Sequence, residues 1–427
     1  MKKLQIGFIV MIMLCFVMIF SGWVLAQEKS KYAGQTIHVA MAWEPREEAL
    51  KNLTKEFEEK TGIKVVVDLL GNVDMKPKML SVLQAKSSEY DVVQFDYALM
   101  PFCVDSGWLL DLTDWVNRDS KEVQPDDFHP ALYNTHIKYK DRWYGFPLHV
   151  NSGCLFYRTD IMKEMGFEPP KNWDEAMKDI KAINEKYAPN PYGISFMGAP
   201  DPLLAIEFQS LLTSQGVDYY DKKTFEPQVN TPGGEKALNI LLEMKKYAPE
   251  GVTGYSLDQS YDAFAQGKAA MSFGFTHGVW FFADPAKSKV VGKFDVMALP
   301  GGHSILGGWF VAISQFSSNK EAAWEWVKWA TSEEMERKLL GNMECPRLSI
   351  LKDPEVQKKW PNNKVFFETL EQSPTIMPQI KSIVELWMKC AVTLNEVLNG
   401  SIEPKPALER MDQEFREILS RDGYLKQ

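Results

Sequence analysis

Apolar residues along the chain form two kinds of run that alternate. Residues 36–43 and 63–70 are short and largely apolar, which predicts buried strands. Between them, over 45–61, apolar residues recur every three or four positions, which is the spacing of one helix face. A strand, a helix and a strand in that order predict two parallel neighbours joined by a right-handed crossover.

The same alternation continues through most of the chain. It predicts helices over 76–86, 98–106, 174–186, 202–214, 233–247 and 383–398, and strands over 91–95, 154–157, 193–195, 272–275 and 307–314. Asn319 is expected to cap a further helix. Either Asn172 or Asp174 is expected to cap the helix that begins near 174. This succession favours an α/β fold with open sheets, in which ligands bind beyond the carboxyl ends of the strands.

The N-terminal segment 1–26 is expected to be a cleaved signal peptide. Lys2 and Lys3 precede an apolar stretch over 4–20, and Val-Leu-Ala at 24–26 offers a small-residue cleavage site. The apolar stretch approaches the length of a membrane-spanning helix, so an uncleaved anchor is the alternative. Cys15 lies inside this stretch, which disfavours a lipid-anchored lipoprotein.

The net charge and the length of the chain limit the classes of function and the number of domains. Loss of the two lysines of the leader takes the formal net charge from −9 to −11. An acidic chain without basic runs or interleaved basic and aromatic residues is not expected to bind nucleic acid. The roughly 400 remaining residues are enough for two or three domains with substantial cores.

Four cysteines follow the leader: Cys103, Cys154, Cys345 and Cys390. Their spacing matches no zinc-binding pattern and contains no C-x-x-C pair. Export would permit disulfides, and four separate buried thiols are equally compatible with the sequence.

Known catalytic motifs are missing from the sequence. The six histidines form no H-E-x-x-H pair, and Ser304 lacks the second glycine of a nucleophile elbow. Residues 302–307 have phosphate-loop spacing, but Gly308 and Trp309 stand where a lysine and a hydroxyl residue are required. Glycoside hydrolysis by a pair of carboxylates remains an alternative, because acidic residues are plentiful. We expect no enzymatic activity and no cofactor.

Two stretches carry a family resemblance. Residues 144–166 read as a short loop over 144–147, an apolar strand over 154–157 and a helix from Thr159, with Asn151 in the segment between loop and strand. Residues 261–275 read as a helix, a glycine and a strand, and Gly-Val-Trp follows at 278–280. This arrangement resembles the extracellular solute-binding proteins of bacterial ABC importers, in the sugar- and oligosaccharide-binding family 1 that includes the maltodextrin-binding proteins.

The resemblance implies a two-lobed periplasmic-binding-protein fold of type II. Each lobe is then a mostly parallel sheet flanked by helices, with a hinge between the lobes. The implied N-terminal lobe is discontinuous, over 35–149 and 307–343, and so is the C-terminal lobe, over 150–304 and 346–427. The family's role is to capture a sugar or oligosaccharide by hinge closure in the periplasm. A monomer would then deliver this carbohydrate to the permease subunits of an ABC transporter.

The resemblance also implies ligand-binding residues, which are Trp43, Glu44, Asn72, Asp96, Asn151, Trp280, Gly308, Trp309, Arg347 and Trp387. Sugars present apolar C–H faces and polar rims, which suit aromatic rings beside planar hydrogen-bonding groups. Most of these residues also have a structural interpretation. Asp96 is suited to cap a helix, and Arg347 is suited to form a salt bridge on the lobe surface. The helical spacing of Trp387 is typical of a residue that packs in the core.

Two departures from the maltodextrin-binding branch bear on the ligand. That branch has an acid at the position of Asn151, and many relatives carry the lipoprotein signal that is missing here. Both departures leave the specific sugar open, but not the class. The alternative functions are an exported glycoside hydrolase, or a binder of a non-sugar solute such as a polyol or a charged metabolite.

Overall fold

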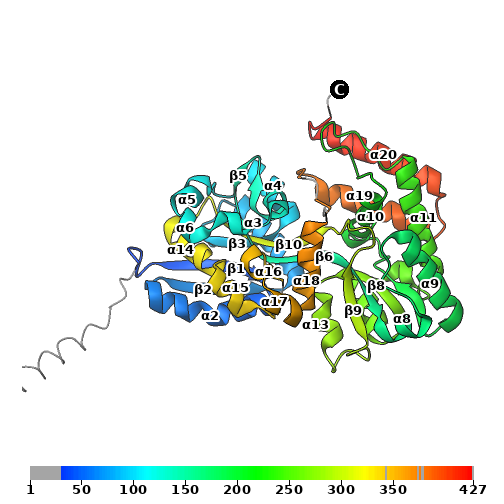
Figure 1. The fold of residues 1–427 in the computed structure, drawn as a ribbon. Helices are drawn as coiled ribbons and strands as arrows, with labels where there is room; N and C mark the ends of the chain where they lie inside the picture. Colours follow the sequence, from blue (N-terminus) through cyan, green and yellow to red (C-terminus); the bar gives the residue numbers. More distant parts are fainter. Residues whose placement is uncertain (1–29, 342–343, 373–374, 377–378, 426–427) are drawn as a thin grey trace, which may run out of the picture.

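The computed structural model describes residues 30–341, 344–372, 375–376 and 379–425. Two α/β lobes lie side by side and share one sheet of eight strands, ordered β2-β1-β3-β10-β6-β8-β7, with β9 also paired to β6 (Figure 1). The predicted fold class is confirmed. The proposed signal peptide over 1–26 lies outside the described residues.

The first lobe is built as its apolar pattern predicts. Strand β1 (Thr36–Ala42) is parallel to β2 (Lys64–Leu70) on one side and to β3 (Val92–Asp96) on the other. Helix α2 (Pro45–Thr61) joins β1 to β2 and ends at Gly62, whose φ of 75° suits glycine. The carboxyl ends of the parallel strands therefore meet at one edge of the sheet.

Short elements complete this lobe before the chain crosses. They are α3 (Asn72–Gln84), η1 (Tyr97–Leu99), α4 (Met100–Asp105), α5 (Thr113–Arg118), α6 (Ser120–Val123), η2 (Pro125–Asp127), α7 (Pro130–Leu132), the π-helix η3 (Tyr133–Ile137), β4 (Lys138–Tyr139) and β5 (Arg142–Trp143). The helix predicted over 98–106 is a 3-10 turn followed by α4, because Asp96 caps the turn by accepting a hydrogen bond from the Ala98 amide.

The crossing between the lobes is one continuous strand, β6 (Phe146–Arg158), of 13 residues. The strand predicted over 154–157 is confirmed but begins earlier, at Phe146. The loop predicted over 144–147 is therefore wrong for residues 146 and 147, and Asn151 lies inside the strand. Its first half pairs with β10, and its second half with β8 and β9. All but the last residue are buried, so the period-two signal of a half-exposed strand is lost.

The second lobe contains β7 (Tyr192–Ser195), β8 (Ala269–Phe275), β9 (Phe294–Ala298), α8 (Thr159–Met165), α9 (Trp173–Tyr187), α10 (Pro202–Ser214), α11 (Pro232–Lys246), η4 (Val252–Gly254), α12 (Leu257–Ala265) and α13 (Gly278–Ala283). Asn172 caps α9, as one of the two predictions for this helix stated, by accepting from the Glu175 amide at 2.9 Å. The parallel pair of this lobe is β7 with β8.

Strand β10 (Leu306–Ile313) returns the chain to the first lobe, where it runs antiparallel to β3. The remaining helices are α14 (Lys320–Ala330), α15 (Glu333–Leu339), α16 (Leu348–Leu351), α17 (Pro354–Lys359), α18 (Pro361–Glu371), α19 (Ile383–Leu398) and α20 (Pro404–Arg421). Asn319 precedes α14, but its side chain accepts no capping bond. It donates instead to the Thr36 carbonyl and to Asp91, which ties the helix start to the sheet.

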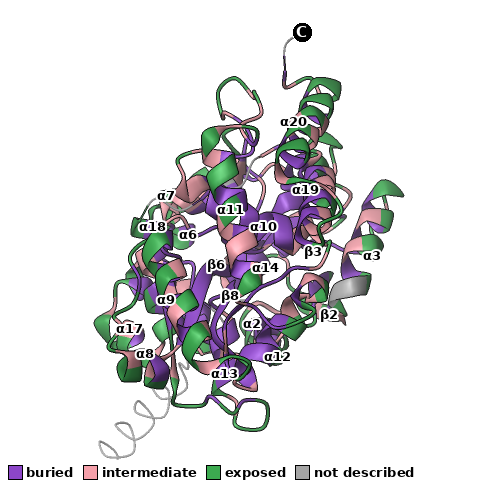
Figure 2. Cartoon of the chain, turned by 90° about the vertical axis from the view of Figure 1, so that its right-hand side faces the viewer, coloured by how far each residue is buried: buried purple, intermediate pink, exposed green. Residues whose placement is uncertain are grey.

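Buried side chains concentrate along the central strands and on α10 and α19 (Figure 2). The first lobe buries Trp324 and Trp326 completely, and the second packs Phe156 against Phe282 with ring centroids 4.7 Å apart. Cys103, Cys154, Cys345 and Cys390 are free and buried, so they serve as apolar core residues. No helix in the described part of the chain is long and apolar enough to cross a membrane.

Candidate functional site

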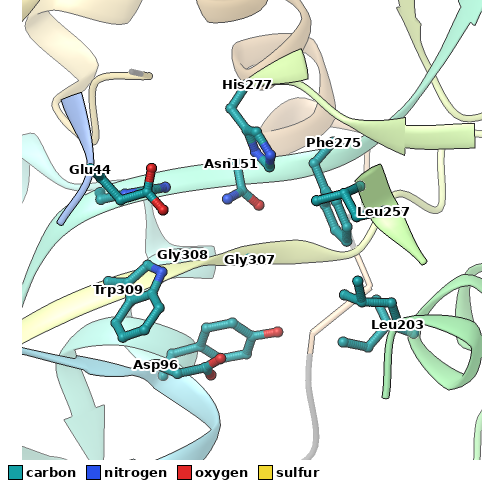
Figure 3. Close-up of a pocket in the computed structure, with 13 residues that line it drawn as sticks. Glu44, Asp96, Asn151, Leu203, Leu257, Phe275, His277, Gly307, Gly308 and Trp309 are labelled. Atoms are coloured by element: carbon teal, nitrogen blue, oxygen red, sulfur yellow. The ribbon is translucent and has the colours of Figure 1, made fainter. Parts of the chain in front are cut away.

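A cavity of about 300 Å³ lies where the strand ends of the two lobes face each other. Its lining comprises Glu44, Asp96, Tyr97, His149, Asn151, Leu203, Ile206, Leu257, Phe275, His277, Gly307, Gly308 and Trp309. Figure 3 shows Glu44 and Trp309 on one side of this cavity, and Leu203, Leu257 and Phe275 on the other. A concave site with a few converging polar groups is the usual form of a small-molecule site.

The first-lobe side is acidic. Glu44 follows the end of β1, and Asp96 is the last residue of β3, directly opposite Trp309 of β10. One oxygen of Asp96 accepts a hydrogen bond from the Ala98 amide at 2.9 Å. Burial raises the pKa of Asp96, against the opposing effects of Lys76 and of the Ala98 amide. Because the Ala98 amide occupies only one oxygen of Asp96, the second oxygen can accept a hydrogen bond from a ligand.

The two crossing strands form the middle of the site. His149 and Asn151 are two residues apart on β6, so they share a face, and they pair with Trp309 and Gly307 of β10. A Cβ on Gly307 would overlap the Asn151 side chain, and one on Gly308, whose φ is 130°, would overlap the His149 carbonyl. Glycine at both positions lets the two backbones approach this closely.

A buried histidine holds this strand pair from behind. The Nε2–H of His136 donates to the Gly307 carbonyl at 3.1 Å, while its Nδ1 lies 2.7 Å from Thr135 Oγ1. Burial lowers the pKa of His136 to about 3, so the ring is neutral at physiological pH. The Tyr97 ring, which lines the site, packs 5.0 Å from it.

The second-lobe side is mostly apolar. Leu203 and Ile206 lie on the first turns of α10, Leu257 begins α12, and Phe275 ends β8. His277 stacks on Phe275 with ring centroids 5.9 Å apart, and burial lowers its pKa to about 3. This side thus offers apolar surface and a neutral imidazole.

Five of the ten predicted residues line the cavity, namely Glu44, Asp96, Asn151, Gly308 and Trp309. Trp43 lies next to Glu44 with its side chain 60% exposed and does not line it. Asn72 begins helix α3, and its side chain lies outside the described part of the structure.

Arg347 does not line the cavity, because its guanidinium is engaged by other residues. Its Nε donates to the Thr331 carbonyl at 2.8 Å and its Nη2 to the Val123 carbonyl at 3.2 Å, while Nη1 pairs with Asp127 at 3.3 Å. The guanidinium also lies 4.6 Å from the Phe128 ring centroid. The predicted surface salt bridge is thus a buried one, and the side chain ties three segments of the first lobe together.

Trp280, which is half-buried, and Trp387, which is buried, also pack against other parts of the protein. Trp280 contacts Trp360 with ring centroids 5.5 Å apart, and Trp387 on α19 is 3% exposed within the second-lobe core. For Trp387 this is the core packing that its helical spacing predicted. Neither ring reaches the cavity in this structure.

Sequence reasoning missed Tyr97, His149, Leu203, Ile206, Leu257, Phe275 and His277 as lining residues. His149 had a usable signal, since it precedes Asn151 by two residues on a strand. The apolar residues had none, because leucine on a helix predicts core packing. Among the described residues, no group of three or more potential ligands could hold a metal ion.

Comparison with known proteins agrees with this geometry. A probable amino-acid ABC transporter periplasmic-binding protein of Sinorhizobium fredii is 23% identical over 406 residues, covering 92% of both chains. The maltotriose-binding protein of Pyrococcus abyssi is 26% identical, covering 82% of this chain and 81% of its own. A ribitol complex of an ABC transporter solute-binding protein from Agrobacterium radiobacter superposes with a TM-score of 0.79 and 27% identity, covering 90% of this chain and 99% of that one.

The family model described as bacterial extracellular solute-binding protein matches residues 43–337. The match spans both lobes and every strand that lines the cavity. The predicted resemblance is confirmed, and the chain belongs to the bacterial extracellular solute-binding protein family.

Proposed function

We propose that this protein captures a small polyhydroxylated solute, a sugar or a polyol, between its lobes and delivers it to the permease of an ABC importer. One observation carries the proposal. Hydrogen-bonding groups of the first lobe face an apolar wall of the second across one cavity at the strand ends, and none of the described lining residues is a lysine or an arginine.

The lining suits hydroxyl groups. Glu44 and Asp96 offer carboxylate oxygens and Asn151 an amide, which can accept from and donate to hydroxyls. Trp309 and Phe275 offer aromatic surface for C–H faces. A volume of about 300 Å³ is at the small end for ligand pockets, which favours a single ring or an acyclic polyol over a long oligosaccharide. The ribitol bound by the Agrobacterium protein has this character.

An amino acid is the second candidate, since the name of the Sinorhizobium relative includes that class. Its α-carboxylate would need a cationic partner or a cluster of backbone N–H donors. The described lining instead presents two acidic side chains, Glu44 and Asp96, to the ligand. Charge complementarity therefore favours a neutral ligand.

Ligand capture would proceed by closure of the lobes. A solute that touches both sides binds the closed form better, and only this difference in affinity shifts the population. A shift from 1:99 to 99:1 requires roughly 5.5 kcal/mol. Several hydrogen bonds to charged groups, at about 1.5–3 kcal/mol each, are of this size.

The remaining assignments follow from this role. We propose cleavage after residue 26, export to the periplasm, action as a monomer and release of the ligand chemically unchanged. We propose 35–149 with 307–343 as the first lobe, and 150–304 with 346–427 as the second. Arg347 and the buried Ile350 and Leu351 nevertheless pack with the first lobe, so the chain after 346 contacts both lobes. The return of β10 to β3 supports the discontinuity of the first lobe.

Thermal denaturation of the chain from residue 27 onward tests the proposal. The panel is ribitol, mannitol, maltose, maltotriose and the common amino acids. A ligand at 100 times its Kd stabilises the native state by about 2.7 kcal/mol, which raises the Tm measurably. A rise with amino acids alone would refute the polyhydroxylated class. Mass spectrometry of the recovered ligand would expose turnover, which would refute simple binding.

A further inference from the structure

A buried polar cluster lies directly behind the cavity wall formed by His149. Its members are Arg46, Glu47, Gln94, His149 and Glu336, of which Arg46, Glu47, Gln94 and Glu336 are fully buried. Arg46 pairs with Glu336 at 2.6 Å. Glu47 is therefore a second buried carboxylate beside one arginine that already has a partner. Buried charges of this kind are costly unless they are paired or perform a role.

Glu47 is held in one orientation by the sheet. Gln94 Nε2 donates to Glu47 Oε1 at 2.6 Å, and Gln94 Oε1 accepts from the Ala42 amide at 2.8 Å. Burial acts to raise the pKa of Glu47, but the contacts with His149 and Gln94 outweigh it and lower the pKa. The carboxylate is thus ionised and can act only as a hydrogen-bond acceptor.

His149 connects this carboxylate to the ligand cavity. Its Nδ1 is buried, lies 3.7 Å from Glu47 Oε1 and has no hydrogen-bond partner within the described residues. The distance is longer than a direct hydrogen bond and within the range of an ion pair. The other titratable groups that face His149 are Glu344, His136 and His277.

The tautomer of a histidine is set by the group that its other nitrogen faces. We propose that Glu47 is a positioning residue for ligand recognition: it fixes the proton of His149 on Nδ1, so that Nε2 meets the ligand as an acceptor. With the proton on Nδ1, Nε2 presents a lone pair, and not an N–H group, to the cavity.

This inference rests on the proposed function and sharpens its ligand class. With Nε2 as an acceptor, His149 joins Glu44 and Asp96 in a site rich in acceptors. Such a site selects solutes that donate many hydrogen bonds, as polyols and sugars do, and leaves unpaired any solute that only accepts. Glu47 would contribute to selectivity without touching the ligand.

Nitrogen-15 NMR of histidine-labelled wild-type protein, free of ligand at pH 8, tests the tautomer directly. The ring signals of His149 are identified by their loss in His149→Gln. We expect a protonated Nδ1 and an unprotonated Nε2. A protonated Nε2, with or without a proton on Nδ1, would overturn the proposal. This result does not depend on which solute binds.

The variant Glu47→Gln provides the second test, because glutamine can donate as well as accept and so releases the tautomer. We expect a mixture of tautomers and about tenfold weaker binding of ribitol or maltotriose by calorimetry. Glu207→Gln is the matched control, since Glu207 is 1% exposed and accepts from the Met197 amide without facing His149. Equal losses in both variants, with an unchanged His149 tautomer, would reduce Glu47 to a structural role. If neither solute binds wild type, the ligand class fails while the NMR result still decides the role of Glu47.

Discussion

Gly307 and Asn151 face each other on β10 and β6 so closely that no side chain fits between them. A Cβ added to Gly307 would overlap the amide oxygen of Asn151, and the two residues are register partners. The Asn151 amide has no hydrogen bond to any described side chain, although the residue is only 7% exposed. The glycine therefore leaves a polar group available to the cavity at the crossing of the lobes.

Substitution of this glycine should impair binding more than folding. Gly307→Ala would push the Asn151 amide out of its position, and we expect at least tenfold weaker ligand binding by calorimetry, about 1.4 kcal/mol. Gly254→Ala is the control, because a Cβ there meets nothing within 4 Å. Wild-type affinity in Gly307→Ala would show that the Asn151 amide does not contact the ligand.

Replacement of Asp96 should raise the stability of the protein and weaken ligand binding. The pKa of Asp96 is raised in the folded state, so its charge disfavours folding at neutral pH, and the cost disappears as the pH falls through the raised pKa. Asp96→Asn keeps an oxygen for the Ala98 amide. We expect a higher Tm at pH 7 with ten- to hundredfold weaker ligand binding, since hydrogen bonds to charged groups contribute about 1.5–3 kcal/mol. A variant that binds normally would remove Asp96 from the site.

Those elements of the fold that the sequence predicted correctly have strong local patterns. Helix α10 (Pro202–Ser214) and helix α19 (Ile383–Leu398) were predicted with their observed bounds. Glu44 and Asp96 were proposed from the family resemblance, and the structure places both in the cavity lining. The helix bounds needed only the spacing along the chain, whereas these two candidates needed the resemblance.

The candidates that do not line the cavity have contacts that spacing along the chain does not encode. Arg347 is engaged by carbonyls of Thr331 and Val123, and the second of these lies more than two hundred positions away in sequence. Trp280 meets Trp360, which lies 80 positions further along the chain. A resemblance transfers a residue type to a position, whereas its partners depend on packing. The apolar wall at Leu203 and Leu257 was missed for the same reason.

The buried pair of Arg46 and Glu336, at 2.6 Å, should be strongly coupled. Arg46→Met leaves the Glu336 charge unpaired, for which we expect a loss of about 3–5 kcal/mol in the free energy of unfolding. The double variant Arg46→Met, Glu336→Met should recover most of that loss, because both charges are gone. Urea denaturation of the four proteins of the cycle measures this. Additive losses would contradict the coupling.

Trp309 should report ligand binding by fluorescence. Its indole lines the cavity, whereas Trp387 is 3% exposed in the second-lobe core. We expect a change in intrinsic emission when the identified solute is added, and expect Trp309→Phe to remove most of it. Trp387→Phe is the matched control and should keep the change. A full signal in Trp309→Phe would place the responding indole elsewhere, for example at the exposed Trp43.

His136 should make folding sensitive to acid. Its pKa is lowered by burial from 6.5 to about 3, so between these values the unfolded state binds more protons than the folded state. His136 therefore lowers the free energy of unfolding only below pH 6.5. As the pH falls from 6.5 towards 3, this free energy decreases by about 1.4 kcal/mol per pH unit.

The variant His136→Gln can still donate to the Gly307 carbonyl but does not titrate. We expect it to be less stable than wild type at pH 7, and expect the difference in unfolding free energy to shrink between pH 6 and pH 4. His38→Gln, which replaces an exposed histidine of the first lobe, is the control substitution. Denaturant titrations at each pH measure these differences, in which the contributions of other titrating groups cancel. A constant difference between wild type and His136→Gln would mean that the ring is protonated in the folded protein, and that the Gly307 carbonyl is held by an imidazolium.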